Sequence, residues 1–293
     1  TPQTASALGG FKVQGKSAAA ARALIDDAKA LEAAGALGDI PLTFVFNADE
    51  EIGSPYSRDL IEAEARSGAF AFVLEAGGLK GEIVTGRKGS FSIRIHVAGQ
   101  AGHAAMAPPD KGSAILALAR QTIAIEALNA PERGITVNVG RFEGGIGYNT
   151  VPGEATAEVD FRFLTEQDAV ALGSAVAAIV GKPQAPNTRA RFEILSSRPP
   201  MPETPEHRRL FETVAAVGRE LGVPVKPEFR FGVSDANLIA AEGTPVIDGL
   251  GPVGSRDHSE DEYMIRSSLP ARTRLLACAI RECWSRWQKG RLF

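Results

Sequence analysis

The stretch PLTFVFNADEEIGS, residues 41–54, joins an apolar run directly to three adjacent acids, Asp49, Glu50 and Glu51. A continuous apolar run of this length is typical of a strand that is covered on both faces. Like charges in a row repel one another, and a buried carboxylate is costly unless something compensates it. Either the acids therefore face open water, or a cation lies between them.

The segments around this stretch alternate between helix and strand. Residues 17–39 are rich in alanine with apolar residues at helical spacing, and residues 59–68 form a second helical pattern. Residues 69–78, AFAFVLEAGG, are typical of another buried strand, and this strand also ends in an acid, Glu75. Such alternation predicts an α/β fold with a mostly parallel sheet flanked by helices. Ligands of these sheets bind beyond the carboxyl ends of the strands, which is where all these acids are expected.

A different pattern starts near Gly89. From here the strands alternate strictly between apolar and polar residues, which is typical of a sheet with one exposed face. The order strand–helix–strand–strand–helix–strand predicts a ferredoxin-like α+β unit with an antiparallel sheet. The predicted strands are 91–99, 134–145, 154–163 and 189–195, and the predicted helices are 111–128 and 165–181.

The α/β pattern returns after this unit. It predicts helices at 205–221 and 267–288 and a short strand within 244–250. The chain is therefore expected to form a discontinuous domain from residues 1–88 and 197–293, interrupted by an inserted domain at 89–196.

The composition is that of an ordinary globular protein. Of the 293 residues, 44% are hydrophobic and 23% are charged, and the net charge of −3 gives no indication of a nucleic-acid partner. No stretch approaches the ~20 apolar residues that a membrane helix needs, and we expect no signal peptide. Cys278 and Cys283 lie in one predicted helix, so free thiols and a cytoplasmic location are expected.

Two interpretations of the three adjacent acids remain open. They could form a solvated turn before the next helix, or they could contribute to a metal site with a neighbouring base. Glu75 favours the metal site, because adjacent parallel strands would bring it close to Glu50 and Glu51. Successive side chains of a regular strand point to opposite faces, so both glutamates would have to lie just past the strand, in the turn.

The sequence contains four histidines. His96 is expected on a strand face and His207 at the exposed start of a helix, so neither suggests a ligand. His103 lies in a glycine- and alanine-rich turn, and His258 lies in a glycine-rich loop at the same carboxyl edge as the acids. Carboxylates with one imidazole suit Zn²⁺, with Mn²⁺ or Co²⁺ as substitutes.

Taken together, the motifs resemble those of metallopeptidase family M20, the dizinc exopeptidases and deacylases. This family includes glutamate carboxypeptidase, acetylornithine deacetylase, succinyl-diaminopimelate desuccinylase and aminoacylase. The resemblance implies a zinc domain interrupted by a lid that dimerises. The matching stretches, in the family's order, are FNADEEIGS (46–54), FVLEAGG (72–78), GRKGSFSIRIHVAGQAGHAAMAP (86–108), GGIGYNTVPGEATAEVDFRF (144–163), RFGVSDAN (230–237) and GLGPVGSRDHSEDEY (249–263).

The resemblance implies roles for four residues around two zinc ions. Glu50 matches the general base, and Glu51 matches the adjacent metal ligand. Glu75 matches the ligand of the other metal, and His258 matches the C-terminal ligand.

The resemblance also implies residues that contact the substrate. His103 matches a lid histidine that reaches into the partner subunit's active site and steadies the oxyanion, which implies a homodimer. Asn149 matches a lid residue that contacts the substrate, and Arg198 matches an arginine that binds the substrate carboxylate in glutamate carboxypeptidases. Gly232 and Ser234 lie in a loop that the family uses to bind the substrate backbone.

The sequence departs from the family in one respect. The upstream His-x-Asp ligand motif and the aspartate that bridges both metals are missing. In the family, a segment like FKVQGK, residues 11–16, runs into that aspartate, whereas Lys16 is followed here directly by the alanine-rich segment. We expect that residues before Thr1 and between Lys16 and Ser17 have been lost from this sequence.

The resemblance favours a glutamate carboxypeptidase-like hydrolase that cleaves an amide bond next to an amino acid carboxylate. An N-acyl amino acid deacylase is the alternative within the same chemistry. A catalytically silent dimeric binding protein with the same fold is the alternative outside it. The expected ligand is a small peptide or an N-acyl amino acid.

Overall fold

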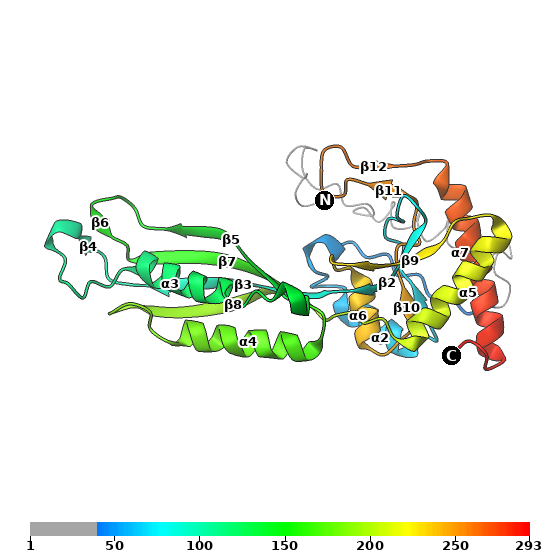
Figure 1. Cartoon of the computed structure of the whole chain (residues 1–293), viewed down its shortest axis with the longest axis horizontal. Helices are drawn as coiled ribbons and strands as arrows, with labels where there is room; N and C mark the ends of the chain where they lie inside the picture. The colour runs from blue at the N-terminus through cyan, green and yellow to red at the C-terminus, as the bar shows by residue number, and fades with distance from the viewer. Residues whose placement is uncertain (1–39) are drawn as a thin grey trace. The chain divides into compact units, whose positions relative to one another are not determined.

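The computed structural model describes residues 40–293, which divide into two compact units (Figure 1). The discontinuous unit comprises the described residues up to Arg87 together with Met201–Phe293, and the inserted unit comprises Lys88–Pro200. The predicted α/β class with a ferredoxin-like insertion is confirmed. In the described part of the chain, no helix has the length and apolar character that crossing a membrane requires.

The inserted unit is an antiparallel sheet with two helices. Its four long strands lie in the order β5-β7-β3-β8, and each neighbouring pair is antiparallel. In chain order the elements are β3 (Gly89–Ala98), α3 (Ala114–Glu126), β5 (Thr136–Gly144), β7 (Glu154–Phe163), α4 (Glu166–Gly181) and β8 (Arg189–Arg198).

One face of this sheet forms the core of the inserted unit. The alternating apolar residues predicted from the sequence, such as Ile93 and Ile95 of β3 and Phe161 of β7, are fully buried against α3 and α4. Ser113 and Thr165 begin the two helices, because their side chains accept hydrogen bonds from backbone N–H groups of the first turn. Beyond the sheet, β4 (Gly102–His103) pairs with β6 (Thr150–Val151), and the 3-10 turns η2 (Ala104–Met106) and η3 (Pro131–Arg133) lie in the connecting loops.

The discontinuous unit contains several short pairs of strands. β1 (Ala71–Phe72) is parallel to β10 (Val246–Ile247), β2 (Glu82–Arg87) is parallel to β9 (Lys226–Arg230), and β11 (Gly254–Ser255) forms a hairpin with β12 (Tyr263–Met264). Its helices are α2 (Arg58–Ser67), α5 (Pro205–Leu221), α6 (Asp235–Ala241) and α7 (Ser268–Gln288), and η1 (Glu50–Ile52) is a single 3-10 turn. Its core lies where α5 and α7 pack around Ile83 and Ile247.

The prediction of a buried strand at residues 41–46 is wrong. The segment is extended but not assigned as a strand, and all six residues are exposed. No hydrogen bond joins its backbone to another described residue, and a strand needs a partner for its N–H and C=O groups. The predicted strand at 69–78 is also shorter, because only Ala71–Phe72 form a regular strand, while Gly77 makes an isolated bridge to Val253. The predicted helix at 17–39 lies outside the described residues.

His207 also differs from its prediction. It lies in the first turn of α5 but is only 4% exposed, and its Nδ1 lies 2.8 Å from the carbonyl oxygen of Pro202. Burial lowers the pKa of this imidazole, which is the direction expected for a cation that loses its water. Cys278 and Cys283 are free thiols, as the sequence predicts.

Candidate metal centre

The acids that follow the apolar segment lie in a tight turn. Glu50 and Glu51 belong to η1, and Gly53 ends it with a φ of 92° and a hydrogen bond from its N–H to the carbonyl of Glu50 at 2.8 Å. Ser54 follows with a φ of 56°, a left-handed conformation that costs a serine about 1–3 kcal/mol. The turn therefore lies past the apolar segment and carries both glutamates, as the metal-site interpretation requires.

Asp49 stabilises this turn from within. Its Oδ2 accepts a hydrogen bond from the N–H of Tyr56 at 2.7 Å, and its Oδ1 accepts one from the hydroxyl of Ser57 at 2.5 Å. Burial acts to raise the pKa of Asp49, but these hydrogen bonds hold it below its usual value. The carboxylate of Asp49 thus binds groups of Tyr56 and Ser57, which leaves Glu50 and Glu51 as the candidates for a cation.

His258 approaches Glu51 from a distant part of the sequence. It lies in the turn between β11 and β12, where its φ of 64° is unusual for a residue with a side chain. Its Nδ1 lies 3.9 Å from Oε2 of Glu51, and both side chains are exposed. The fold therefore places two of the predicted metal ligands, Glu51 and His258, next to each other.

Glu75 belongs to the same electrostatic environment. It follows β1 and is half-buried, and its pKa is raised to about 7. Burial is the main cause, and the negative charges of Asp248, Glu50 and Glu51 add to it, while Arg87 acts in the opposite direction. A bound cation would relieve this repulsion.

The chemistry of these side chains fits a divalent cation, but the set is incomplete. Zn²⁺ takes carboxylate and imidazole ligands in proteins, with at least three protein ligands in most sites. Within residues 40–293, no three His, Cys, Asp or Glu side chains are grouped closely enough to hold a metal ion. Glu51 and His258 form a pair, and Glu75 interacts with Glu51 through charge. The described residues thus fit part of a metal site.

A buried ion pair supports the loops beside these acids. Arg87 donates from Nε and Nη2 to Oδ2 of Asp248, at 2.9 and 2.6 Å, and both side chains are almost fully buried. Arg87 also donates from Nη1 to the carbonyl of Gly232 at 2.8 Å, and the Ser234 hydroxyl donates to Asp248 at 2.6 Å. The ion pair thus fixes, through these hydrogen bonds, the loop of Gly232 and Ser234, which are predicted to bind substrate.

Sequence reasoning missed four residues of this region. Asn47 and Asp235 connect the turn to α6, and Arg87 and Asp248 form the buried pair. Asp248 could have been found, because it is an acid at the end of the apolar run within 244–250, as Glu75 is within 69–78. Asn47 and Asp235 both lie in the motifs quoted above, but nothing local indicates that they meet.

The remaining predicted residues lie in the inserted unit. His103 and Asn149 are neighbours, because β4 pairs with β6 and the N–H of Ala104 donates to the carbonyl of Asn149 at 2.9 Å. The Nδ1 of His103 accepts a hydrogen bond from the N–H of Ala105 at 3.2 Å, which leaves the proton of a neutral ring on Nε2. Arg198 ends β8 opposite Ser90 and is buried.

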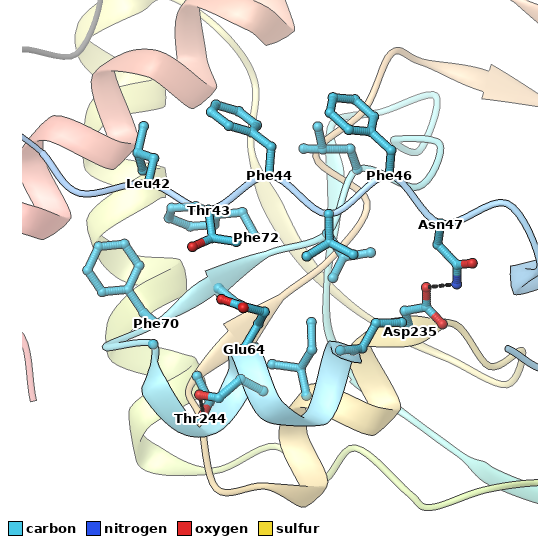
Figure 2. Close-up of a pocket in the computed structure, with 18 of the residues that line it drawn as sticks. Leu42, Thr43, Phe44, Phe46, Asn47, Glu64, Phe70, Phe72, Asp235 and Thr244 are labelled. Carbon is cyan, nitrogen blue, oxygen red and sulfur yellow. Dashed lines mark hydrogen bonds between the residues drawn. The ribbon is translucent and has the colours of Figure 1, made fainter. Parts of the chain in front are cut away.

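A large cavity of about 2020 Å³ adjoins the acids in the discontinuous unit. The extended segment 41–46 forms one wall, and Phe70, Phe72, Trp284 and Trp287 contribute to the others. Figure 2 shows Leu42, Phe44 and Phe46 on one side of this segment and Thr43 on the other, toward Phe72. Glu50, Glu51 and Glu75 also line this cavity, so apolar and acidic surfaces are combined in one place.

Comparison with known proteins identifies the inserted unit. Residues 85–188 match the family described as "Peptidase dimerisation domain" of the M20 peptidases. They are an M20 peptidase dimerisation domain. The predicted resemblance to family M20 is therefore confirmed.

Individual M20 relatives extend over most of the chain. Carboxypeptidase G2 of Pseudomonas sp. (strain RS-16) is 27% identical over 239 residues, which cover 80% of this chain and 58% of that protein. N-acetyl-L-citrulline deacetylase of Xanthomonas campestris pv. campestris is 29% identical over 255 residues, which cover 83% of this chain and 67% of that protein. The crystal structure of aminopeptidase PepT from Bacillus cereus has the same fold, with a TM-score of 0.65 and 20% identity over 88% of this chain and 68% of its own.

The N-terminal residues have a different similarity. Residues 1–45 match the family described as "Ketopantoate hydroxymethyltransferase". Most of this range lies outside the described residues. The match gives no support to the interpretation of residues 11–16 as the start of an M20 ligand segment.

The raised pKa of Glu75 predicts a pH-dependent cost in the metal-free protein. Because its folded pKa of about 7 lies above the value of 4.5 for a solvated glutamate, the contribution of Glu75 to stability is present at low pH and is lost as the pH rises from 4.5 to 7. Glu75→Gln should therefore raise the free energy of unfolding, relative to wild type, by about 3 kcal/mol more at pH 8 than at pH 4. Urea unfolding in the presence of a chelator measures this difference.

Glu132→Gln is the matched control, because Glu132 is exposed in η3 and should show no such pH dependence. A difference between Glu75→Gln and wild type that is the same at both pH values would contradict the electrostatic account of Glu75.

Proposed function

We propose that the chain is a metal-dependent hydrolase that cleaves an amide bond next to an amino acid carboxylate, in the manner of glutamate carboxypeptidases. The approach of Glu51 and His258 to 3.9 Å, beside the raised pKa of Glu75, is the observation that carries the proposal. The similarity to carboxypeptidase G2 supports the choice of substrate class. The chain spans 58% of the length of that relative.

Glu51, Glu75 and His258 would hold the metal, which we propose to be two zinc ions, with cobalt or manganese as substitutes. Bound metal of this kind supplies a Lewis acid for the carbonyl oxygen and lowers the pKa of water toward ~7. Glu50 lies next to Glu51 in η1 and is half-buried. Its carboxylate would take a proton from the attacking water and deliver it to the leaving amine.

The inserted unit would contribute the groups that bind the substrate. His103, with its proton on Nε2, would donate a hydrogen bond to the developing oxyanion, a contribution of roughly 3–4 kcal/mol. Asn149 would orient the substrate beside it, and Arg198 would bind the substrate carboxylate through two parallel hydrogen bonds. We propose that residues 89–196 act as the lid of a cytoplasmic homodimer, so that His103 serves the partner's site.

Two other functions are supported by specific observations. Similarity to an N-acetyl-L-citrulline deacetylase favours an N-acyl amino acid deacylase, which would use the same groups. Within residues 40–293 no three His, Cys, Asp or Glu side chains are grouped around one point, and a catalytically silent dimeric binding protein with the same fold would not need such a group. A panel of dipeptides and N-acyl amino acids, assayed with added Zn²⁺, distinguishes the three functions. A carboxypeptidase cleaves the dipeptides, a deacylase cleaves the N-acyl amino acids, and a silent binding protein cleaves neither.

Glu50→Gln tests the proposed base. The substitution keeps the size of the side chain but removes the proton acceptor, so turnover should fall by about 10²–10⁴-fold while bound zinc, measured by mass spectrometry, stays unchanged. Glu132→Gln should leave both quantities at the wild-type level. Retained turnover in Glu50→Gln would refute the role of Glu50, and absence of turnover from the wild type would favour the silent binding protein.

Arg198→Lys tests the proposed carboxylate contact. Lysine keeps the charge but cannot form two parallel hydrogen bonds, so KM for a substrate with a free carboxylate should rise about tenfold or more. The matching substrate with a carboxamide in place of the carboxylate should be affected less. An equal change for both substrates would show that the buried Arg198 acts on the fold rather than on the carboxylate.

A further inference from the structure

Residues on both sides of the turn that carries Glu50 and Glu51 donate hydrogen bonds to the carboxylate of Asp235. Asn47 precedes the turn and donates from Nδ2 to Oδ2 of Asp235 at 2.6 Å (Figure 2). Ser54 follows the turn, and its hydroxyl donates to Oδ1 of the same aspartate at 2.7 Å. The Nδ2 of Asn47 also donates to the hydroxyl oxygen of Ser54 at 2.9 Å, which closes a ring of three side chains.

This ring acts where the backbone of the turn is strained. Ser54 is fully buried and has a φ of 56°, a conformation that an unsupported serine rarely adopts. Its N–H donates to the carbonyl of Asp49 at 2.9 Å, so its position decides how tightly the turn is closed. The two oxygens of Asp235 therefore support a backbone conformation that the sequence of the turn does not favour.

Asp235 is itself held firmly. It is the first residue of α6, and Ser234 before it caps the helix with Asn237 in a reciprocal pair of hydrogen bonds. The hydroxyl of Ser234 is bound to Asp248, which is paired with Arg87. A continuous series of hydrogen bonds thus connects the buried ion pair, through the start of α6, to the turn.

We propose that Asp235 is a positioning residue, whose carboxylate fixes Asn47 and Ser54 and thereby sets where Glu50 and Glu51 lie relative to Glu75 and His258. Its effect on the turn follows from the hydrogen bonds to Asn47 and Ser54. Its effect on metal binding rests on the proposed function, since residues that orient metal ligands typically change metal affinity by about 10–100-fold.

Asp235→Ala tests the turn directly by hydrogen–deuterium exchange. The amides of Gly53 and Ser54 should exchange at least about tenfold faster than in wild type, while peptides from α5 keep their protection. Asp59→Ala is the matched control, because Asp59 is an exposed acid in the first turn of α2 and should leave Gly53 and Ser54 protected. Wild-type exchange rates at Gly53 and Ser54 in Asp235→Ala would overturn the proposal.

A second pair of variants keeps the test valid where Asp235→Ala does not fold. Asp235→Asn keeps one acceptor oxygen but replaces the other with an NH2 group, so Asn47 and Ser54 can no longer both donate to residue 235 and the turn should loosen. Adding Asn47→Asp exchanges the two side-chain types and restores one carboxylate and one amide across the contact, so protection of Ser54 should return. Failure of the exchange to restore protection would count against a specific contact.

Zinc affinity, measured by competition with a chromophoric chelator, gives the second readout. Asp235→Ala and Asp235→Asn should bind Zn²⁺ about 10–100-fold more weakly than wild type, and Asp59→Ala should bind as wild type does. Faster exchange at Ser54 with no zinc binding by the wild type would retain the positioning role and reject the metal site. Unchanged zinc affinity in a variant with a loosened turn would reject the link between the two.

Discussion

The buried ion pair between Arg87 and Asp248 is the interaction on which the candidate site depends. The two side chains are 5% and 0% exposed, so each charge would be left without water if the other were removed. Breaking such a pair costs about 3–5 kcal/mol because the remaining charge stays buried. Arg87 at the end of β2 binds Gly232 in the loop before α6, and Asp248 after β10 binds Ser234 in the same loop. Asp235 at the start of α6 then binds Asn47 and Ser54, on either side of Glu50 and Glu51.

Electrostatics links this support to the proposed chemistry. Asp248 is compensated by Arg87, but its charge still acts on Glu75, together with those of Glu50 and Glu51. A stable fold would gain by separating these acids, whereas a metal site gains by keeping them together. This edge of the unit therefore differs from an ordinary acidic surface in two ways. Its carboxylates lie close to one another and to the imidazole of His258, and the buried pair of Arg87 and Asp248 fixes the neighbouring loop.

Local sequence patterns predicted the inserted unit well and the discontinuous unit only in part. Strict alternation in β3 and β7 fixes which residues are buried, so Ile93 and Phe161 could be placed from sequence alone. The apolar run at 41–46 carries the signal of a buried strand, but strand formation depends on a neighbouring strand, which the described residues do not supply. Asp235 was missed because its partner Asn47 lies far away in the sequence, and no local pattern predicts this contact. The position of Asp248 at the end of an apolar run is visible in the sequence, but its pairing with Arg87 is not.

The central claim is that Glu51, Glu75 and His258 gather around two divalent cations at one edge of the discontinuous unit. Anomalous X-ray diffraction at the zinc absorption edge, from crystals grown with Zn²⁺, tests it most directly. The account predicts a peak with a carboxylate oxygen of Glu51 and a ring nitrogen of His258 each about 2.0–2.2 Å away. A well-ordered crystal in which zinc is absent from this edge, or in which these side chains point away from one another, would contradict it.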